Sequence, residues 1–177
     1  MSEIDFMRQA LECARQGIAA GQMPIGSVLV LDGQVLLAAH NTVWADTDPS
    51  AHAEMNGIRR AAKQLGRVSL AGCTVYCTLE PCPMCLAACH WAKVDRIVFG
   101  ADIADAAAAG FSELALPAAE LARQGKSHLR IEGGVLADEC RRLFDEWRAS
   151  GSIARRLTSS TLPASPASET GGSGPGS

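Results

Sequence analysis

A short cysteine motif, together with a histidine further upstream, constrains this chain more than any other feature. Cys82 and Cys85 are three residues apart in the run Glu80-Pro81-Cys82-Pro83-Met84-Cys85, where the prolines favour the first turn of a helix. Cysteines with this spacing share one face of a helix start, and the partial positive charge there favours their thiolates. His52 can supply a third ligand. Three protein ligands predict a catalytic zinc, because they leave one tetrahedral position open for water.

Glu54 follows His52 in the sequence His52-Ala53-Glu54, so its carboxylate would lie beside that water. Zinc lowers the pKa of bound water to about 7, and a neighbouring carboxylate can then carry its proton to the substrate. The alternative role is an exposed carboxylate that stabilises a helix N-terminus. A His-x-Glu paired with a Pro-Cys-x-x-Cys is typical of zinc deaminases, which favours the catalytic role for Glu54.

Two further interpretations of the cysteines stay open. Cys73 and Cys77 could join Cys82 and Cys85 in a structural site, but four residues along an extended segment span roughly 13 Å, too far for one ion. Alternatively, the chain could be a zinc-stabilised binding module without catalytic activity. Glu54 argues against this second class, because a purely structural metal site has no use for it.

The composition predicts one globular domain in the cytoplasm. The 177 residues are 47% hydrophobic and 20% charged, and the first residues show no signal peptide. No apolar run is long enough to cross a membrane. The seven cysteines are then expected to be thiols or metal ligands. A net charge of −3 gives no general attraction to nucleic acid.

The pattern of apolar residues and turn residues predicts alternating helices and strands. An Asp-Gly pair at 32–33 indicates a hairpin, and a strand, helix and strand around the cysteine motif indicate a parallel crossover. Asp48 is expected to cap the helix that carries His52, with Pro49 in its first position. Residues 104–116 are ambiguous. The expected helices are 4–18, 49–65, 83–91 and 136–147, and the expected strands are 25–31, 34–39, 73–78, 96–99 and 129–131.

The C-terminal segment differs in composition from the rest. From Thr158 onward the chain is almost entirely Ser, Thr, Pro, Gly and Ala, which cannot bury enough apolar surface to offset its ordering entropy. We therefore expect a zinc-dependent domain over residues 1–157 and a disordered tail over 158–177.

The motifs at His52–Glu54 and Pro81–Cys85, with the hairpin and the Asp48–Ala51 lead-in, resemble the cytidine-deaminase-like superfamily over roughly residues 4–150. The resemblance implies an α/β fold, namely a three-layer α/β/α sandwich with a mixed five-stranded sheet, and a homodimer. It also implies one zinc ion per chain and a hydrolase that replaces an exocyclic amine of a base with oxygen.

Two branches of the superfamily match best. Segments 58–66, 90–93 and 105–111 resemble bacterial guanine deaminases, whereas 134–140 resembles tRNA adenosine deaminases. The acidic chain lacks the general basic charge that a tRNA enzyme needs, so the small nucleobase guanine, converted to xanthine, is the predicted substrate. Adenosine in a tRNA anticodon loop is the alternative, with Arg59, Arg60, Arg141 and Arg142 as candidate RNA contacts, and cytosine comes third.

The resemblance also suggests substrate contacts. Asn41 is expected to hydrogen-bond the base, although a loop asparagine can also simply satisfy a turn. Backbone N–H groups near Ala53 would hold the polar edge of the substrate. Ile25 and Trp91 could line the pocket, although core packing is the usual role of such apolar residues. Glu113 stands where guanine deaminases carry a base-contacting aspartate.

Overall fold

The computed structural model describes residues 1–111 and 114–151. Its centre is a mixed five-stranded sheet in the order β2-β1-β3-β4-β5, which confirms the predicted sheet. β1 is antiparallel to both β2 and β3, whereas β4 is parallel to β3 and to β5. The strands are β1 (Gly26–Leu31), β2 (Gln34–His40), β3 (Thr74–Leu79), β4 (Arg96–Ala101) and β5 (Arg130–Glu132).

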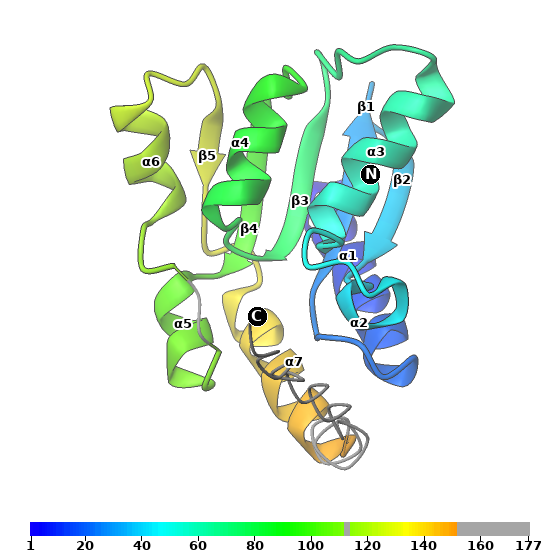
Figure 1. The fold of residues 1–177 in the computed structure, drawn as a ribbon, viewed down its shortest axis with the longest axis vertical. Helices are drawn as coiled ribbons and strands as arrows, with labels where there is room; N and C mark the ends of the chain where they lie inside the picture. Colours follow the sequence, from blue (N-terminus) through cyan, green and yellow to red (C-terminus); the bar gives the residue numbers. More distant parts are fainter. Residues whose placement is uncertain (112–113, 152–177) are drawn as a thin grey trace, which may run out of the picture.

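Helices cover both faces of the sheet and complete the predicted three-layer sandwich (Figure 1). The first and last helices, α1 and α7, pack on one face, and α3, α4 and α6 pack on the other. Each face buries its own apolar cluster. The helices are α1 (Glu3–Ala19), α2 (Val43–Asp46), α3 (Ala53–Leu65), α4 (Pro83–Trp91), α5 (Ile103–Ala108), α6 (Ala118–Gln124) and α7 (Ala137–Ala149).

Local sequence signals explain the main turns. Asp32 and Gly33 both have positive φ angles, 51° and 72°, as a two-residue hairpin turn requires. Gly66 ends α3 in the left-handed conformation, at φ 64°. Pro83 occupies the first turn of α4, where the missing N–H of proline costs little. The predicted parallel crossover is confirmed, since α4 connects the parallel strands β3 and β4.

The structure corrects the helix start that was predicted at Asp48. This helix, α3, begins at Ala53, and His52 is its N-cap. Asp48 instead accepts hydrogen bonds from the backbone N–H and the hydroxyl of Ser50, at 2.8 and 2.6 Å. Such a local turn competes with helix formation at Pro49. His52 therefore precedes the helix instead of lying inside it.

Two short helices were not predicted, namely α2 in the polar loop after Asn41 and α6 after Pro117. The ambiguous segment 104–116 includes most of α5. The predicted domain boundary at residue 157, the predicted tail and Glu113 all lie outside the described residues.

Candidate metal and catalytic site

The two halves of the predicted motif meet because two helices begin at the same place. His52 is the N-cap of α3 and Cys82 is the N-cap of α4, and neither makes a side-chain capping bond. Cys82 comes shortly after the last residue of β3, so α4 presents its N-terminus at the carboxyl end of that strand. An N-cap side chain that does not cap its own helix can instead bind a ligand at the helix start.

The distances between the three predicted ligands fit one zinc ion. His52 Nδ1 lies 3.7 Å from Cys82 Sγ and 3.6 Å from Cys85 Sγ, and all three ligand atoms lie within 4.8 Å of one another. Zn–S bonds of about 2.3 Å and Zn–N bonds of about 2.0 Å at a tetrahedral angle place nitrogen and sulfur about 3.6 Å apart. Two thiolates and an imidazole are also a donor set that zinc prefers.

Glu54 occupies the predicted position next to this cluster. Its side chain is only 3% exposed, and its Oε2 lies 3.6 Å from Cys85 Sγ. Burial raises the pKa of the Glu54 carboxyl to about 7, because a buried carboxylate loses its hydration. A carboxyl with a pKa near neutrality can both accept and donate a proton at physiological pH.

The two cysteines shift each other's pKa in opposite directions. The hydrogen bond from Cys85 holds the pKa of Cys82 down at about 4, and His52 adds to this effect. The same bond and burial raise the pKa of Cys85 well above its usual range. A divalent cation reverses the second shift, since a coordinating thiol is deprotonated outright.

Asn41 lies in a loop that is hydrogen-bonded to the residues preceding His52. The backbone N–H of Thr42 donates to Ala51 O at 2.9 Å. Asn41 is fully buried, and its Oδ1 accepts a hydrogen bond from the N–H of Val43 at 3.1 Å. Within residues 1–111 and 114–151, the Nδ2 group of Asn41 has no hydrogen-bond partner. A buried donor without a partner is costly, which fits a group that donates to a ligand.

One residue that holds this loop was missed from the sequence. Asn56 Nδ2 donates to the carbonyls of His40 and Ala51 and to the hydroxyl of Thr42, at 3.0, 3.2 and 2.8 Å. The signal was available, because Asn56 lies four residues after His52 and therefore on the same side of α3.

Of the other predicted substrate residues, two are buried in the core and one is exposed at the far end of α4. Ala53 is fully buried at the start of α3, and Ile25 is 5% exposed in the same apolar cluster. The N–H of Asn41 donates to Ile25 O at 3.0 Å, so the backbone of Ile25 supports the loop that holds Asn41. Trp91 is the last residue of α4 and is 73% exposed, so it lies away from the metal end of that helix.

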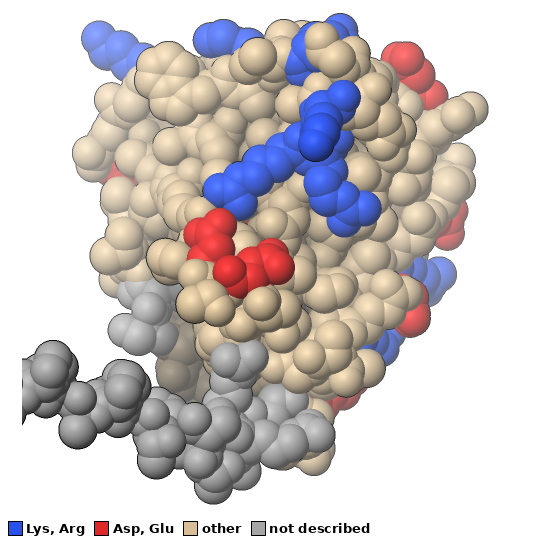
Figure 2. Space-filling view, turned by 45° about the vertical axis from the view of Figure 1, so that its right-hand side comes forward, with Lys and Arg blue, Asp and Glu red and all other residues tan. Residues whose placement is uncertain are grey.

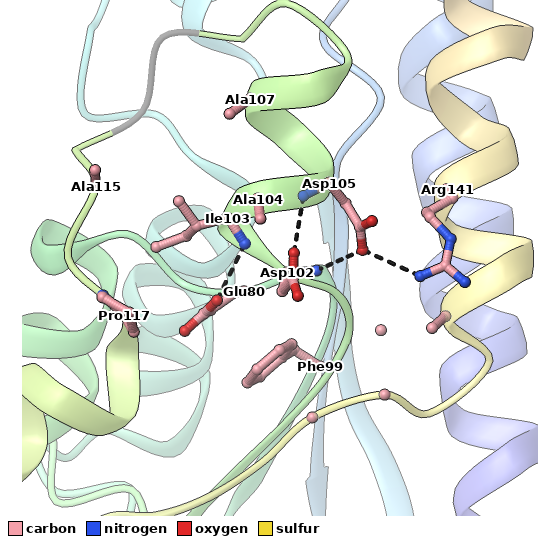
Figure 3. Close-up of a pocket in the computed structure, with 14 residues that line it drawn as sticks. Glu80, Phe99, Asp102, Ile103, Ala104, Asp105, Ala107, Ala115, Pro117 and Arg141 are labelled. Atoms are coloured by element: carbon pink, nitrogen blue, oxygen red, sulfur yellow. Dashed lines mark hydrogen bonds and ion pairs between the residues drawn. The ribbon is translucent and has the colours of Figure 1, made fainter.

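Glu80 is a second buried carboxylate that was not predicted to matter. Its oxygens accept hydrogen bonds from the N–H groups of Ile103 and Ala118, at 3.1 and 2.7 Å, and so tie β3 to α5 and α6. It borders a hollow of about 640 Å³ between α5, α7 and the ends of β4 and β5, which none of the three ligands lines (Figure 3). A charged residue at the end of an apolar strand was the signal in the sequence.

The alternative with four cysteine ligands is not supported. Cys73 and Cys77 are fully buried in the apolar cluster beneath α3, α4 and α6. In the part of the chain that the structure describes, the cluster that could hold a metal consists of His52, Cys82 and Cys85.

Comparison with known proteins agrees with this geometry. The family described as the cytidine and deoxycytidylate deaminase zinc-binding region matches residues 1–101. The chain belongs to this family. It is therefore a zinc-dependent deaminase, with His52, Cys82 and Cys85 as its zinc-binding cluster.

The relatives of this deaminase include a guanine deaminase and a tRNA-specific adenosine deaminase. Guanine deaminase of Bacillus subtilis is 41% identical over 114 residues, or 64% of this chain and 73% of the relative. The tRNA-specific adenosine deaminase of the same organism is 36% identical over 155 residues, or 85% of this chain and 94% of the relative.

Solved structures include relatives of both kinds. A guanine deaminase from Nitrosomonas europaea superposes with a TM-score of 0.76 at 26% identity, covering 84% of this chain and 85% of that chain. A structure from a study of A-to-I editing by tRNA:A34 deaminases gives 0.70 at 33% identity, covering 78% and 98%. In residues 1–111 and 114–151, no helix of this deaminase is long and apolar enough to span a membrane.

Proposed function

We propose that this deaminase hydrolyses free guanine to xanthine and ammonia. The observation that carries the proposal is the buried Nδ2 group of Asn41, a donor without a partner in the described residues, in a loop bonded to the residues before His52. A guanine ring offers carbonyl and ring-nitrogen acceptors for such a donor. The relationship to guanine deaminases in sequence and in fold supports the same substrate.

Glu54 is proposed as the group that moves protons. When bound, zinc supplies the positive charge that makes a water molecule nucleophilic near neutral pH. Glu54 accepts one proton from that water and passes it to a ring nitrogen as the oxygen adds to the carbon bearing the amine. It then takes the remaining proton of the new hydroxyl group and delivers it to the departing amine, which leaves a carbonyl. Water and guanine are consumed, and xanthine and ammonia are released. The buried carboxylate beside the ligands favours this role over a non-catalytic binding module.

The net charge of the chain also supports a neutral substrate. The chain has 16 Lys and Arg against 19 Asp and Glu. This excess of carboxylates disfavours a phosphate backbone, whereas it exerts no net force on an uncharged base.

A basic face on α3 favours a second candidate, adenosine in a tRNA anticodon loop. Figure 2 shows Lys and Arg side chains gathered over one face of the molecule. Arg60, Lys63 and Arg67 are exposed, and none of them makes an ion pair within the described residues. Arg59, on the same helix, donates at 2.8 Å to the hydroxyl of Ser50, two residues before His52. Such a row of cations could contact phosphates. Cytosine remains the third candidate.

The expected homodimer also remains a proposal, and α4 supports it. This helix carries no Asp, Glu, Lys or Arg, and its exposed side includes Ala87 and Trp91. An exposed tryptophan on an apolar helix is typical of an interface between proteins. Sedimentation velocity should show a dimer that Trp91→Glu converts to a monomer; a monomeric wild-type protein would contradict the proposal.

Ammonia release distinguishes the substrates. Zinc-loaded protein is offered guanine, cytosine, adenine, their nucleosides and a tRNA anticodon stem-loop, each at low and high salt. We expect guanine turnover that changes little with salt, because no counterions are released when a neutral base binds. Inosine formation that falls steeply with salt, with guanine untouched, would establish the tRNA alternative. The matched variant Arg60→Glu/Lys63→Glu should then abolish stem-loop turnover, and it should leave guanine turnover unchanged if guanine is the substrate.

A further inference from the structure

The last helix makes direct contact with the short helix after Asn41 and with residues 109–111, which follow α5. α7 packs on the same face of the sheet as α1, and Figure 1 shows it between α5 and α2. Four of the eight aromatic residues of the chain gather at this contact, which is a large share for a protein with 5% aromatic residues. They are Trp44, Phe111, Phe144 and Trp147.

The first contact reaches the loop that holds Asn41. Trp44 lies in α2, three residues after Asn41, and its ring stacks on Trp147 of α7 with centroids 6.2 Å apart and planes inclined by 22°. The N–H groups of Trp44 and Ala45 also donate to the buried Oε1 of Gln22, each at 3.2 Å. α2 is therefore fixed from two sides, and Asn41 Oδ1 is bonded to the first residue of this short helix.

The second contact reaches the segment that leads to residue 113. The ring of Phe111 lies 5.0 Å from that of Trp147 and 5.3 Å from that of Phe144. Arg148 donates to the carbonyl of Ala109 at 2.7 Å. Trp147 is the residue that touches both loops, since it contacts Trp44 on one side and Phe111 on the other.

We infer that α7 is a clamp on the loop that holds Asn41 and that Trp147 is its central positioning residue, itself braced by Phe111. The inference rests on the proposed role of Asn41 and deepens it, because it names what holds Asn41 in place. A four-residue helix is too short to be stable alone, so its orientation depends on packing. A loop that is already fixed on a rigid helix loses less conformational entropy when a base binds to it.

The environment of the Trp147 indole indicates which variants distinguish ring packing from hydrogen bonding. Trp147 is 8% exposed, and its Nε1 has no hydrogen-bond partner in the described residues. The clamp therefore depends on the aromatic ring and not on a hydrogen bond. Trp147→Phe should preserve it, whereas Trp147→Leu should lose the ring contacts to Trp44 and Phe111. Trp44→Leu removes the ring contact between Trp44 and Trp147 from the other side. It tests the same contact if Trp147→Leu does not fold.

A matched control separates the clamp from a general loss of stability. Phe6 of α1 is 4% exposed and packs on Tyr76 with ring centroids 5.2 Å apart, in the same apolar cluster but without a ring contact to either loop. Phe6→Leu should lower the melting temperature without changing KM. All variants should bind about one zinc per chain, because none of them alters a ligand.

The experiment measures backbone hydrogen exchange and steady-state kinetics on zinc-loaded protein. Trp147→Leu should speed exchange in residues 41–46 and 109–111 and lower kcat/KM about ten- to a hundredfold, mainly through KM. Trp147→Phe should behave like the wild type in both. Unchanged exchange in these loops, or an unchanged KM despite faster exchange, would overturn the inference. If guanine is not the substrate, the wild-type protein will release ammonia from another base, and KM is then measured with that base.

Discussion

His52 and Cys82 illustrate how a backbone can place metal ligands before a metal binds. Both are N-caps, so their side chains project from the ends of α3 and α4 toward the same point. A fixed arrangement of this kind lowers the ordering cost of binding. The N–H groups of both first helical turns also face this region, where partial positive charge favours thiolates and anionic transition states.

Glu54→Gln tests proton transfer with the smallest change in shape. The variant should keep its zinc and its fold but lose about 10²- to 10⁴-fold in kcat, the usual contribution of a general acid–base. Zinc content, circular dichroism and ammonia release are compared with the wild type. Turnover near the wild-type rate would contradict the assigned role.

Removal of zinc should change the reactivity of one thiol. Cys82 is half-buried with a pKa lowered to about 4, so its thiolate should alkylate readily at pH 7 once a chelator has removed the ion. Cys140, whose pKa burial raises to about 12, should stay unmodified. Mass spectrometry of alkylated peptides measures both.

Cys85→Ala should bind far less than one zinc per chain, because it removes one of the three ligands. Metal analysis measures this; a full complement of zinc in that variant would remove Cys85 from the ligand set.

Residue-level prediction succeeded where short spacing fixes geometry. Cys82 and Cys85 share a helix start, and the Cys-x-x-Cys spacing alone places their thiols together. The place of Asn41 depends instead on how a loop crosses the start of α3, which no local pattern specifies. Trp91 was placed wrongly by proximity in sequence, because it lies at the end of α4 opposite Cys82.

At the scale of elements, Glu80 holds three of them together. Its buried carboxylate accepts hydrogen bonds from the first residues of α5 and α6, immediately after β3 ends. Glu80→Ala would leave both N–H groups buried and unpaired, so we expect a loss of about 2–4 kcal/mol in the free energy of unfolding. Urea denaturation measures it. Phe99→Leu, at the same hollow but without these bonds, serves as the control; an equal or smaller loss in Glu80→Ala would contradict the role.

The long elements were predictable because each carries its own periodic pattern. α1 carries Ile4, Met7, Leu11, Ala14 and Ile18 at helical spacing; the last four are buried, whereas Ile4 in the first turn is 37% exposed. The two missed helices, α2 and α6, have four and seven residues, too few to show a period. The predicted start of α3 was wrong because Asp48 accepts hydrogen bonds from Ser50 in a local turn, and an aspartate that caps a turn looks the same in sequence as one that caps a helix.

For the whole molecule, the zinc cluster joins segments that are far apart in the chain. His52 begins α3 and the cysteines begin α4, so a bound ion links two helices of one layer. An ion that binds only the folded chain, present at roughly 1,000 times its Kd, stabilises it by about 4 kcal/mol. Chelation should therefore lower Tm by about 10 °C. Scanning calorimetry with and without chelator tests this, and zinc should restore the original Tm; an unchanged Tm would contradict the link.

The hairpin turn at Asp32 and Gly33 lies at the end of the sheet opposite the metal cluster, because β1 runs antiparallel to β3. Asp32 and Gln34, on either side of Gly33, are both exposed. A solid support attached through this turn would orient every molecule with its catalytic end toward the solution. An immobilised layer built in this way should keep the turnover per molecule of the free protein.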